Sequence, residues 1–137
     1  MIKKGTLAIL LLLLVPAVLF STPNKKSQKY GKLGGKLGFM AMATDAYYEI
    51  CFSKGMRTDN HLRGIDKLMK KKWRISFSEV KLYLEERSGR DFREEAHTLV
   101  NSIIKKTKGC NSPGMNKWFD TISKIHSKNL DKFHALK

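Results

Sequence analysis

The sequence predicts an all-α protein: a compact bundle of four to five helices with one disulfide, after a cleaved signal peptide and a flexible basic segment. Apolar residues recur at helical spacing in several segments. No segment alternates apolar and polar residues over a strand length, and no Asn-Gly or Asp-Gly pair marks a hairpin. The predicted boundaries are a signal peptide at 1–21, a flexible Gly/Lys-rich segment at 22–36 and a helical domain at 37–137.

The N-terminal 21 residues have the three parts of a secretory signal. Two lysines precede an apolar run at 7–20, and small or polar residues follow it. This run is shorter than the roughly 20 residues of a membrane span. We therefore expect cleavage after Ser21, or alternatively after Ala17, with an uncleaved anchor as the other interpretation. The leader predicts an exported protein, in the bacterial periplasm or alternatively secreted.

The charge of the chain is strongly positive. Without the leader, 25 basic and 12 acidic residues remain, a net charge of +13. Such a charge favours an acidic partner, which could be a protein, another polyanion or an anionic membrane surface. Export argues against intracellular nucleic acid as the partner.

The two cysteines, Cys51 and Cys110, are predicted to form a disulfide. An exported chain with one cysteine pair and no third cysteine is typical of a structural cross-link. Closing a loop of this length should stabilise the fold by about 4 kcal/mol in the chain-entropy model. Two cysteines alone do not provide the four ligands of a structural zinc site.

The segment 22–36 is polar, basic and rich in glycine, which predicts a flexible lead-in to the helical domain. Its glycines also recur at a spacing of four, so close helix contact is the alternative. The first helix is expected at 37–54. It is apolar nearly all round, which indicates a central helix, and Gly55 is placed to end it.

The second helix is expected to begin at a cap formed by Thr58 or Asp59 and to end near Trp73. The third helix has a capping box, in which Ser76 and Glu79 exchange hydrogen bonds between side chain and backbone. It should end near residue 88.

Two more helices follow. Asp91 starts the fourth helix in a pattern that resembles a capping box, and the helix should reach about residue 108. Ser112 caps the last helix, and Pro113 occupies its first position. That helix could extend to about residue 136.

The densest positive charge lies at the end of the second predicted helix, and we take it as the candidate surface for an anionic partner. A tryptophan among cations could stack on a partner or enter a membrane surface. The alternative is a tryptophan in the core beside solvated lysines. The candidate residues are Lys67, Lys70, Lys71, Lys72, Trp73 and Arg74.

His126 and Asn129 form a candidate pocket, because both fall on the apolar face of the last helix and a buried polar group needs a partner. A hydrogen-bonded core histidine is the alternative. His97 and His134 each follow a carboxylate by three residues, as in some metal sites. Helical geometry directs Glu94, Asp131 and His134 away from the core and places His97 only at the margin of an apolar face, so we expect solvated helix faces and no metal site.

The sequence contains no catalytic or cofactor motif, and no serine, histidine and acid stand at a spacing that singles out a hydrolase. We therefore expect a non-catalytic binding or adaptor module for an acidic partner in the cell envelope, without a cofactor. The alternatives are a peripheral protein of anionic membranes and an enzyme without a recognisable motif.

Overall fold

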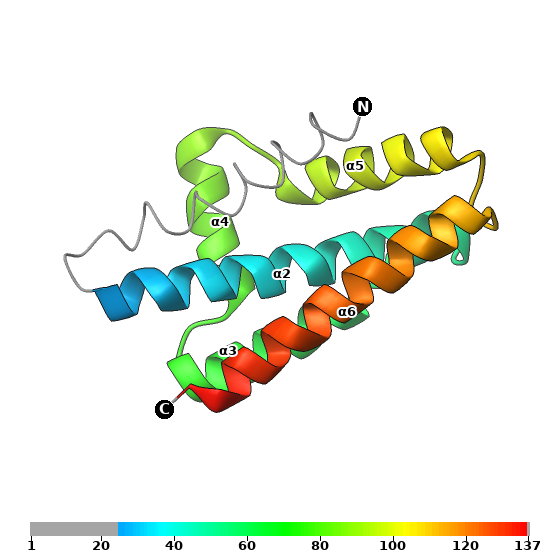
Figure 1. Cartoon of the computed structure of the whole chain (residues 1–137). Coiled ribbons are helices and arrows are strands. Elements are labelled where there is room, and N and C mark those ends of the chain that lie inside the picture. Colours follow the sequence, from blue (N-terminus) through cyan, green and yellow to red (C-terminus); the bar gives the residue numbers. More distant parts are fainter. Residues whose placement is uncertain (1–24, 137) are drawn as a thin grey trace.

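The structure is a computed structural model that describes residues 25–136, so the predicted signal peptide lies outside the described residues. Between residues 25 and 136 the chain forms five helices and no strand, which confirms the all-α prediction (Figure 1). None of these helices is long and apolar enough to cross a bilayer. The helices are α2 (Lys25–Cys51), α3 (Asn60–Trp73), α4 (Phe77–Ser88), α5 (Phe92–Thr107) and α6 (Pro113–Ala135).

Helix α2 is the central element of the bundle and contacts each of the other four helices (Figure 1). The sequence predicted this position, because apolar residues surround the helix instead of forming one stripe. Burial on all sides removes most of its apolar surface from water, which is the main favourable term in folding. Its buried apolar residues are Leu33, Leu37, Phe39, Met40, Ala41, Met42, Ala43, Ala46 and Tyr47.

Helix α2 begins at Lys25, so the prediction of a flexible segment at 22–36 is wrong for residues 25–36. Gly34 of this segment and Gly38, one helical turn later, are contact points. A Cβ atom added to Gly38 would lie 2.0 Å from the ring of Phe77, and one added to Gly34 would lie 3.0 Å from the nearest atom of α3. Packing of α3 and α4 against this glycine face offsets the low helix propensity of glycine. Close helix contact, the alternative interpretation, is therefore confirmed.

The helix ends follow the predicted signals with small shifts. Helix α2 ends at Cys51, before the expected residue 54, and Gly55 follows with a φ of 85°. The capping box of α4 is confirmed. The Ser76 side chain accepts a hydrogen bond from the backbone N–H of Glu79, and the Glu79 carboxylate accepts one from the backbone N–H of Ser76.

Helices α5 and α6 also begin where the sequence predicted. The Asp91 carboxylate accepts a hydrogen bond from the backbone N–H of Glu94, and the Ser112 hydroxyl accepts one from the backbone N–H of Met115. Pro113 is the first residue of α6, and the helix is continuous to Ala135. Local capping chemistry was therefore sufficient to place both starts.

The predicted disulfide is present. Cys51, the last residue of α2, is bonded to Cys110 in the connection between α5 and α6, with 5.7 Å between the Cα atoms. The bond joins the central helix to the start of the last helix. It therefore restrains the end of the molecule at which α2 ends and α6 begins (Figure 1).

Candidate functional site

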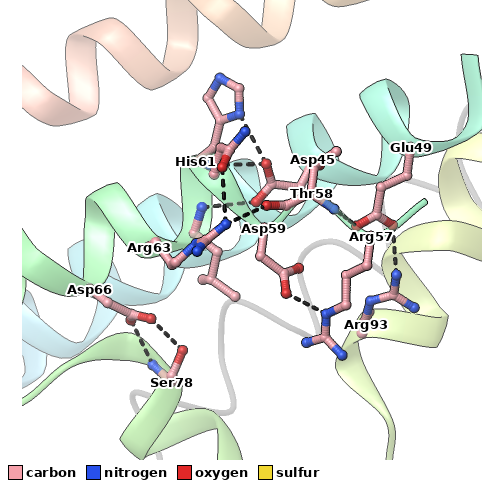
Figure 2. Close-up of polar contacts among 12 residues, drawn as sticks. Asp45, Glu49, Arg57, Thr58, Asp59, His61, Arg63, Asp66, Ser78 and Arg93 are labelled. Atoms are coloured by element: carbon pink, nitrogen blue, oxygen red, sulfur yellow. Dashed lines mark hydrogen bonds and ion pairs between the residues drawn. The ribbon is translucent and has the colours of Figure 1, made fainter. Parts of the chain in front are cut away.

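Two carboxylates lie inside the bundle on α2, one turn apart. Asp45 is 3% exposed and Glu49 is 1% exposed. The Asp45 carboxylate accepts hydrogen bonds from the backbone N–H groups of His61 and Leu62, both at 2.9 Å, and lies 3.0 Å from Nδ1 of His61 (Figure 2). Burial alone would raise the pKa of Asp45, but these hydrogen bonds outweigh it and hold the pKa below the usual carboxylate value.

Asp45 therefore caps α3 from within α2, which corrects the expectation of a local cap. Asp59 precedes the helix in a left-handed conformation, with a φ of 46°, and its side chain makes no capping hydrogen bond. The Asp59 carboxylate pairs with Arg57 instead, and the backbone N–H of Thr58 donates to Glu49. Unpaired N–H groups at a helix start need acceptors, and here an earlier helix provides them.

Glu49 joins α2 to the loop before α3 and to α5. Its carboxylate lies 3.0 Å from the backbone nitrogen of Thr58, 2.7 Å from Nη2 of Arg93 and 2.5 Å from Nε2 of His97. Desolvation raises the pKa of Glu49, but the hydrogen bonds and the positive charge of Arg93 together lower it by more, so the net shift is downward. His97 was expected on a solvated face. It is instead partly buried, with Nε2 against the Glu49 carboxylate.

A small charged cleft lies beside these carboxylates, between α2, the loop before α3, α4 and α5. Its charged lining residues are Asp45, Glu49, Arg57, Asp59, Lys81 and Arg93. The cations there already have anionic partners, since Arg57 pairs with Asp59, Lys81 with Glu85 and Arg93 with Glu49. Between residues 25 and 136, no three His, Cys, Asp or Glu side chains gather as a metal site requires.

The pairing of Asp45 with His61 has the geometry that orients a general base in many hydrolases. Nδ1 of His61 faces the buried carboxylate, and the side chain is 45% exposed. The ring also stacks on Tyr48 at 5.5 Å between centroids. In the described part of the chain no hydroxyl or thiol group hydrogen-bonds to His61, so the structure offers no partner that would make the pair a nucleophilic site.

The first turns of two more helices donate hydrogen bonds to a carboxylate of the preceding helix. In the α3–α4 pair, Asp66 accepts hydrogen bonds from the backbone and the hydroxyl of Ser78. In the α4–α5 pair, Glu85 accepts a hydrogen bond from the backbone N–H of Phe92 at 2.8 Å. Together with Asp45, these residues show that much of the small acidic complement is used inside the fold. The excess positive charge therefore remains on the surface.

The candidate residues for an anionic partner fall into two groups: cations without an ion pair, and side chains that already contact other groups of the bundle. Lys67, Lys71 and Arg74 are exposed, and none forms an ion pair with the residues that the structure describes. We call these three residues the basic end. Lys70 is also exposed but pairs with Glu79 at 2.7 Å.

The side chains of Lys72 and Trp73 contact other helices of the bundle. Nζ of Lys72 donates hydrogen bonds to backbone carbonyls at the end of α6, including that of Phe133, and lies 4.9 Å from the Phe133 ring centroid. Trp73 stacks on Tyr30 of α2 at 5.2 Å and meets Phe133 edge-on at 4.9 Å. Trp73 is thus a packing residue that joins three helices, and the free charge lies on its neighbours.

The basic end lies where α2 begins and where α3 and α6 end (Figure 1). The parts of α2, α3 and α6 at this end are residues 29–36, 67–74 and 128–134, and Asp131 is the one acidic residue in these three ranges. They also contain further exposed lysines, namely Lys29, Lys32, Lys128 and Lys132. The end as a whole therefore presents a positive field to any approaching anion.

His126 and Asn129 lie on the inner side of α6, as the sequence predicted. Asn129 is 4% exposed, and Nδ2 of Asn129 and Nδ1 of His126 are buried without a hydrogen-bond partner in the described residues. Desolvation and the neighbouring His61 lower the pKa of His126, which favours the neutral imidazole. The charged cleft is lined by other residues, so a pocket at this pair remains a prediction.

No known protein family, curated protein or solved structure matches this chain. The buried positions of Asp45 and Glu49 were not predicted from the sequence, although a signal was present. Two carboxylates spaced by four on a helix that is otherwise apolar all round must both be buried, and buried carboxylates need donors.

Proposed function

We propose that this protein is an exported, non-catalytic binding or adaptor module that holds an acidic partner at its basic end. The observation that carries the proposal is the set of three exposed cations on one helix end, Lys67, Lys71 and Arg74, without ion pairs in the described part of the chain. Most other acidic side chains are engaged in caps and pairs, so little negative charge opposes an anion there.

Two features of the scaffold support this role. The helix end that carries the three cations is fixed by Trp73, which packs against α2 and α6. A helix that is already fixed loses little backbone freedom when a partner binds. The partner would be recognised by its density of negative charge, as in an acidic protein segment or a polyphosphate.

The test is salt-dependent binding of two probes, polyphosphate and poly-L-glutamate, to the mature protein. We expect the logarithm of the affinity to fall linearly with the logarithm of salt concentration. The variant Lys67→Gln/Lys71→Gln/Arg74→Gln should bind at least tenfold more weakly, with a salt slope smaller by about 2. Far-UV circular dichroism would verify that it folds.

A control variant with the same loss of charge removes three exposed cations elsewhere, with the changes Arg87→Gln, Lys105→Gln and Lys124→Gln. It should retain most of the affinity. Equal losses in both variants would show that net charge alone attracts the probes, and a salt-independent affinity would exclude the electrostatic mechanism. Either result would overturn the assignment of the basic end.

Export is the second part of the proposal, and the disulfide supports it, because such bonds persist in oxidising compartments. Either cleavage site precedes Lys25, so all five described helices would remain in the mature chain. Expression of the full chain in a bacterium followed by fractionation and intact mass measurement tests this. We expect periplasmic protein that begins after Ser21 or Ala17 and has no free thiol, whereas cytoplasmic protein with two thiols would contradict export.

A further inference from the structure

The end of the molecule opposite the basic end exposes two large apolar side chains. Here α2 ends, α6 begins and the disulfide joins them (Figure 1). Phe52 is 57% exposed and Met56 is 73% exposed, and both lie in the turn that follows Cys51. Single exposed apolar residues are ordinary on protein surfaces, so their surroundings decide whether these two have a role.

Phe52 continues an aromatic cluster that reaches the core. The Phe52 ring lies 5.4 Å from that of Tyr47 and 5.6 Å from that of Tyr48. Both tyrosines also contact Phe119 of α6, at 4.7 Å and 5.8 Å. Phe52 is therefore the outer member of a continuous apolar surface that extends out of the bundle.

The backbone of this turn is fixed. The backbone N–H of Ser53 donates to the carbonyl of Tyr48, and that of Gly55 donates to the carbonyl of Glu49. The disulfide at Cys51 anchors the same turn to the connection between α5 and α6. The fold thus holds Phe52 and Met56 toward solvent, and their exposure does not come from a loose loop.

Exposed lysines accompany the apolar pair. Lys54 lies between Phe52 and Met56 in the chain, and Lys108 lies two residues before Cys110. Lys117 is next to Trp118, whose ring is 6.2 Å from that of Tyr47. None of the three lysines forms an ion pair with the residues from 25 to 136. We call Phe52, Met56 and these three lysines the disulfide tip.

We propose that the disulfide tip docks onto an anionic lipid bilayer, with Phe52 and Met56 in the interfacial layer and the lysines at the headgroups. Aromatic and apolar side chains beside lysines are the composition of interfacial membrane anchors. Lysine stems can also lie along apolar surface while their charges stay at the headgroups. Protein–protein interfaces are depleted in lysine at their centres, which favours a membrane over a protein partner here.

The sequence offered Trp73 as a candidate for membrane contact, with a core tryptophan as the alternative. In the structure its ring is packed against Tyr30 and Phe133, and the disulfide tip is a different surface. The disulfide tip and the basic end lie at opposite ends of the bundle (Figure 1). A membrane-docked molecule would therefore leave the basic end free for an acidic partner. The membrane proposal does not depend on the proposed function.

Vesicle flotation tests the proposal with the mature protein. Vesicles of phosphatidylcholine alone are compared with vesicles that contain phosphatidylglycerol as a substantial fraction. We expect binding at least tenfold stronger to the anionic vesicles. The variant Phe52→Ser/Met56→Ser should bind them at least tenfold more weakly, because two apolar side chains no longer leave water.

Two control variants locate the contact. Leu82 and Tyr83 of α4 are also exposed, and Leu82→Ser/Tyr83→Ser should leave vesicle binding unchanged. The basic-end variant described above should keep at least a third of the affinity. Unchanged binding by the tip variant, or loss of binding only in the basic-end variant, would overturn the proposal. So would an absence of wild-type binding to anionic vesicles.

The two tryptophans provide a readout of orientation, because Trp118 borders the aromatic cluster of the tip and Trp73 lies at the other end of the bundle. In vesicles with brominated acyl chains, the variant Trp73→Phe, which keeps Trp118, should show quenched fluorescence. The variant Trp118→Phe, which keeps Trp73, should show little quenching. The reverse pattern would contradict docking through the tip even if the protein binds anionic vesicles.

Discussion

The carboxylate of Asp45 lies 2.9 Å from the backbone nitrogen of Leu62, so a residue in the C-terminal part of α2 caps the start of α3. The same carboxylate accepts a hydrogen bond from the backbone of His61. One buried side chain thus satisfies two N–H groups that would otherwise lack acceptors. It also fixes where the second helix begins relative to the central one.

This tertiary cap predicts opposite outcomes for two aspartates. Asp45→Ala should destabilise the fold by about 3 kcal/mol, because it leaves buried donors without an acceptor. Asp59→Ala, at the position that the sequence favours as the cap, should cost less than about 1 kcal/mol, because it loses only a pair with the exposed Arg57. Urea unfolding at pH 7 measures both values. Equal costs would contradict a cap provided by α2.

The depressed pKa of Asp45 predicts a loss of stability in acid. In the folded protein the pKa of Asp45 lies below its unfolded value of about 4. The charged form therefore stabilises the fold fully above that value, and this contribution is lost as the pH falls through the folded pKa. We expect the difference in unfolding free energy between wild type and Asp45→Asn to shrink below about pH 4. A difference that stays constant to pH 2.5 would contradict the prediction.

His126 predicts a second, separate pH dependence. Burial lowers its pKa below the usual value of 6.5, so the unfolded chain binds a proton more readily than the folded chain. Stability should therefore decrease as the pH falls from about 6.5 toward the folded pKa. His126→Leu should reduce the difference in unfolding free energy between pH 7.5 and pH 5.5. An unchanged difference in this variant would contradict the prediction.

Two helical glycines predict effects of opposite sign. Gly38→Ala places a Cβ 2.0 Å from the Phe77 ring and should destabilise the fold by about 3 kcal/mol, because α4 must move away from α2. Gly64 of α3 has nothing within 4 Å of an added Cβ, so Gly64→Ala should stabilise by about 1 kcal/mol through helix propensity. Thermal and urea unfolding of both variants provide the measurement. Two gains of stability would disprove close packing at Gly38.

The parts of the candidate site that could be predicted are those that local pattern determines. The run of cations from Lys67 to Arg74 and the inward face of His126 follow from composition and helical periodicity, and the structure places both on the expected faces. The division of the cations into free and occupied residues could not be predicted. It depends on Lys72 reaching the end of α6, a contact between residues more than sixty positions apart.

The sequence by itself determined the helical class, the starts of α4, α5 and α6 and the pairing of Cys51 with Cys110. Each depends on a local signal or on a count that allows one solution. Only the tertiary structure decided the start of α2 and the cap of α3. The low helix propensity of glycine wrongly predicted a later start for α2, because packing against other helices contributes more free energy than local preference. The nearest aspartate, Asp59, was wrongly predicted as the cap of α3, because a carboxylate on α2 occupies that role.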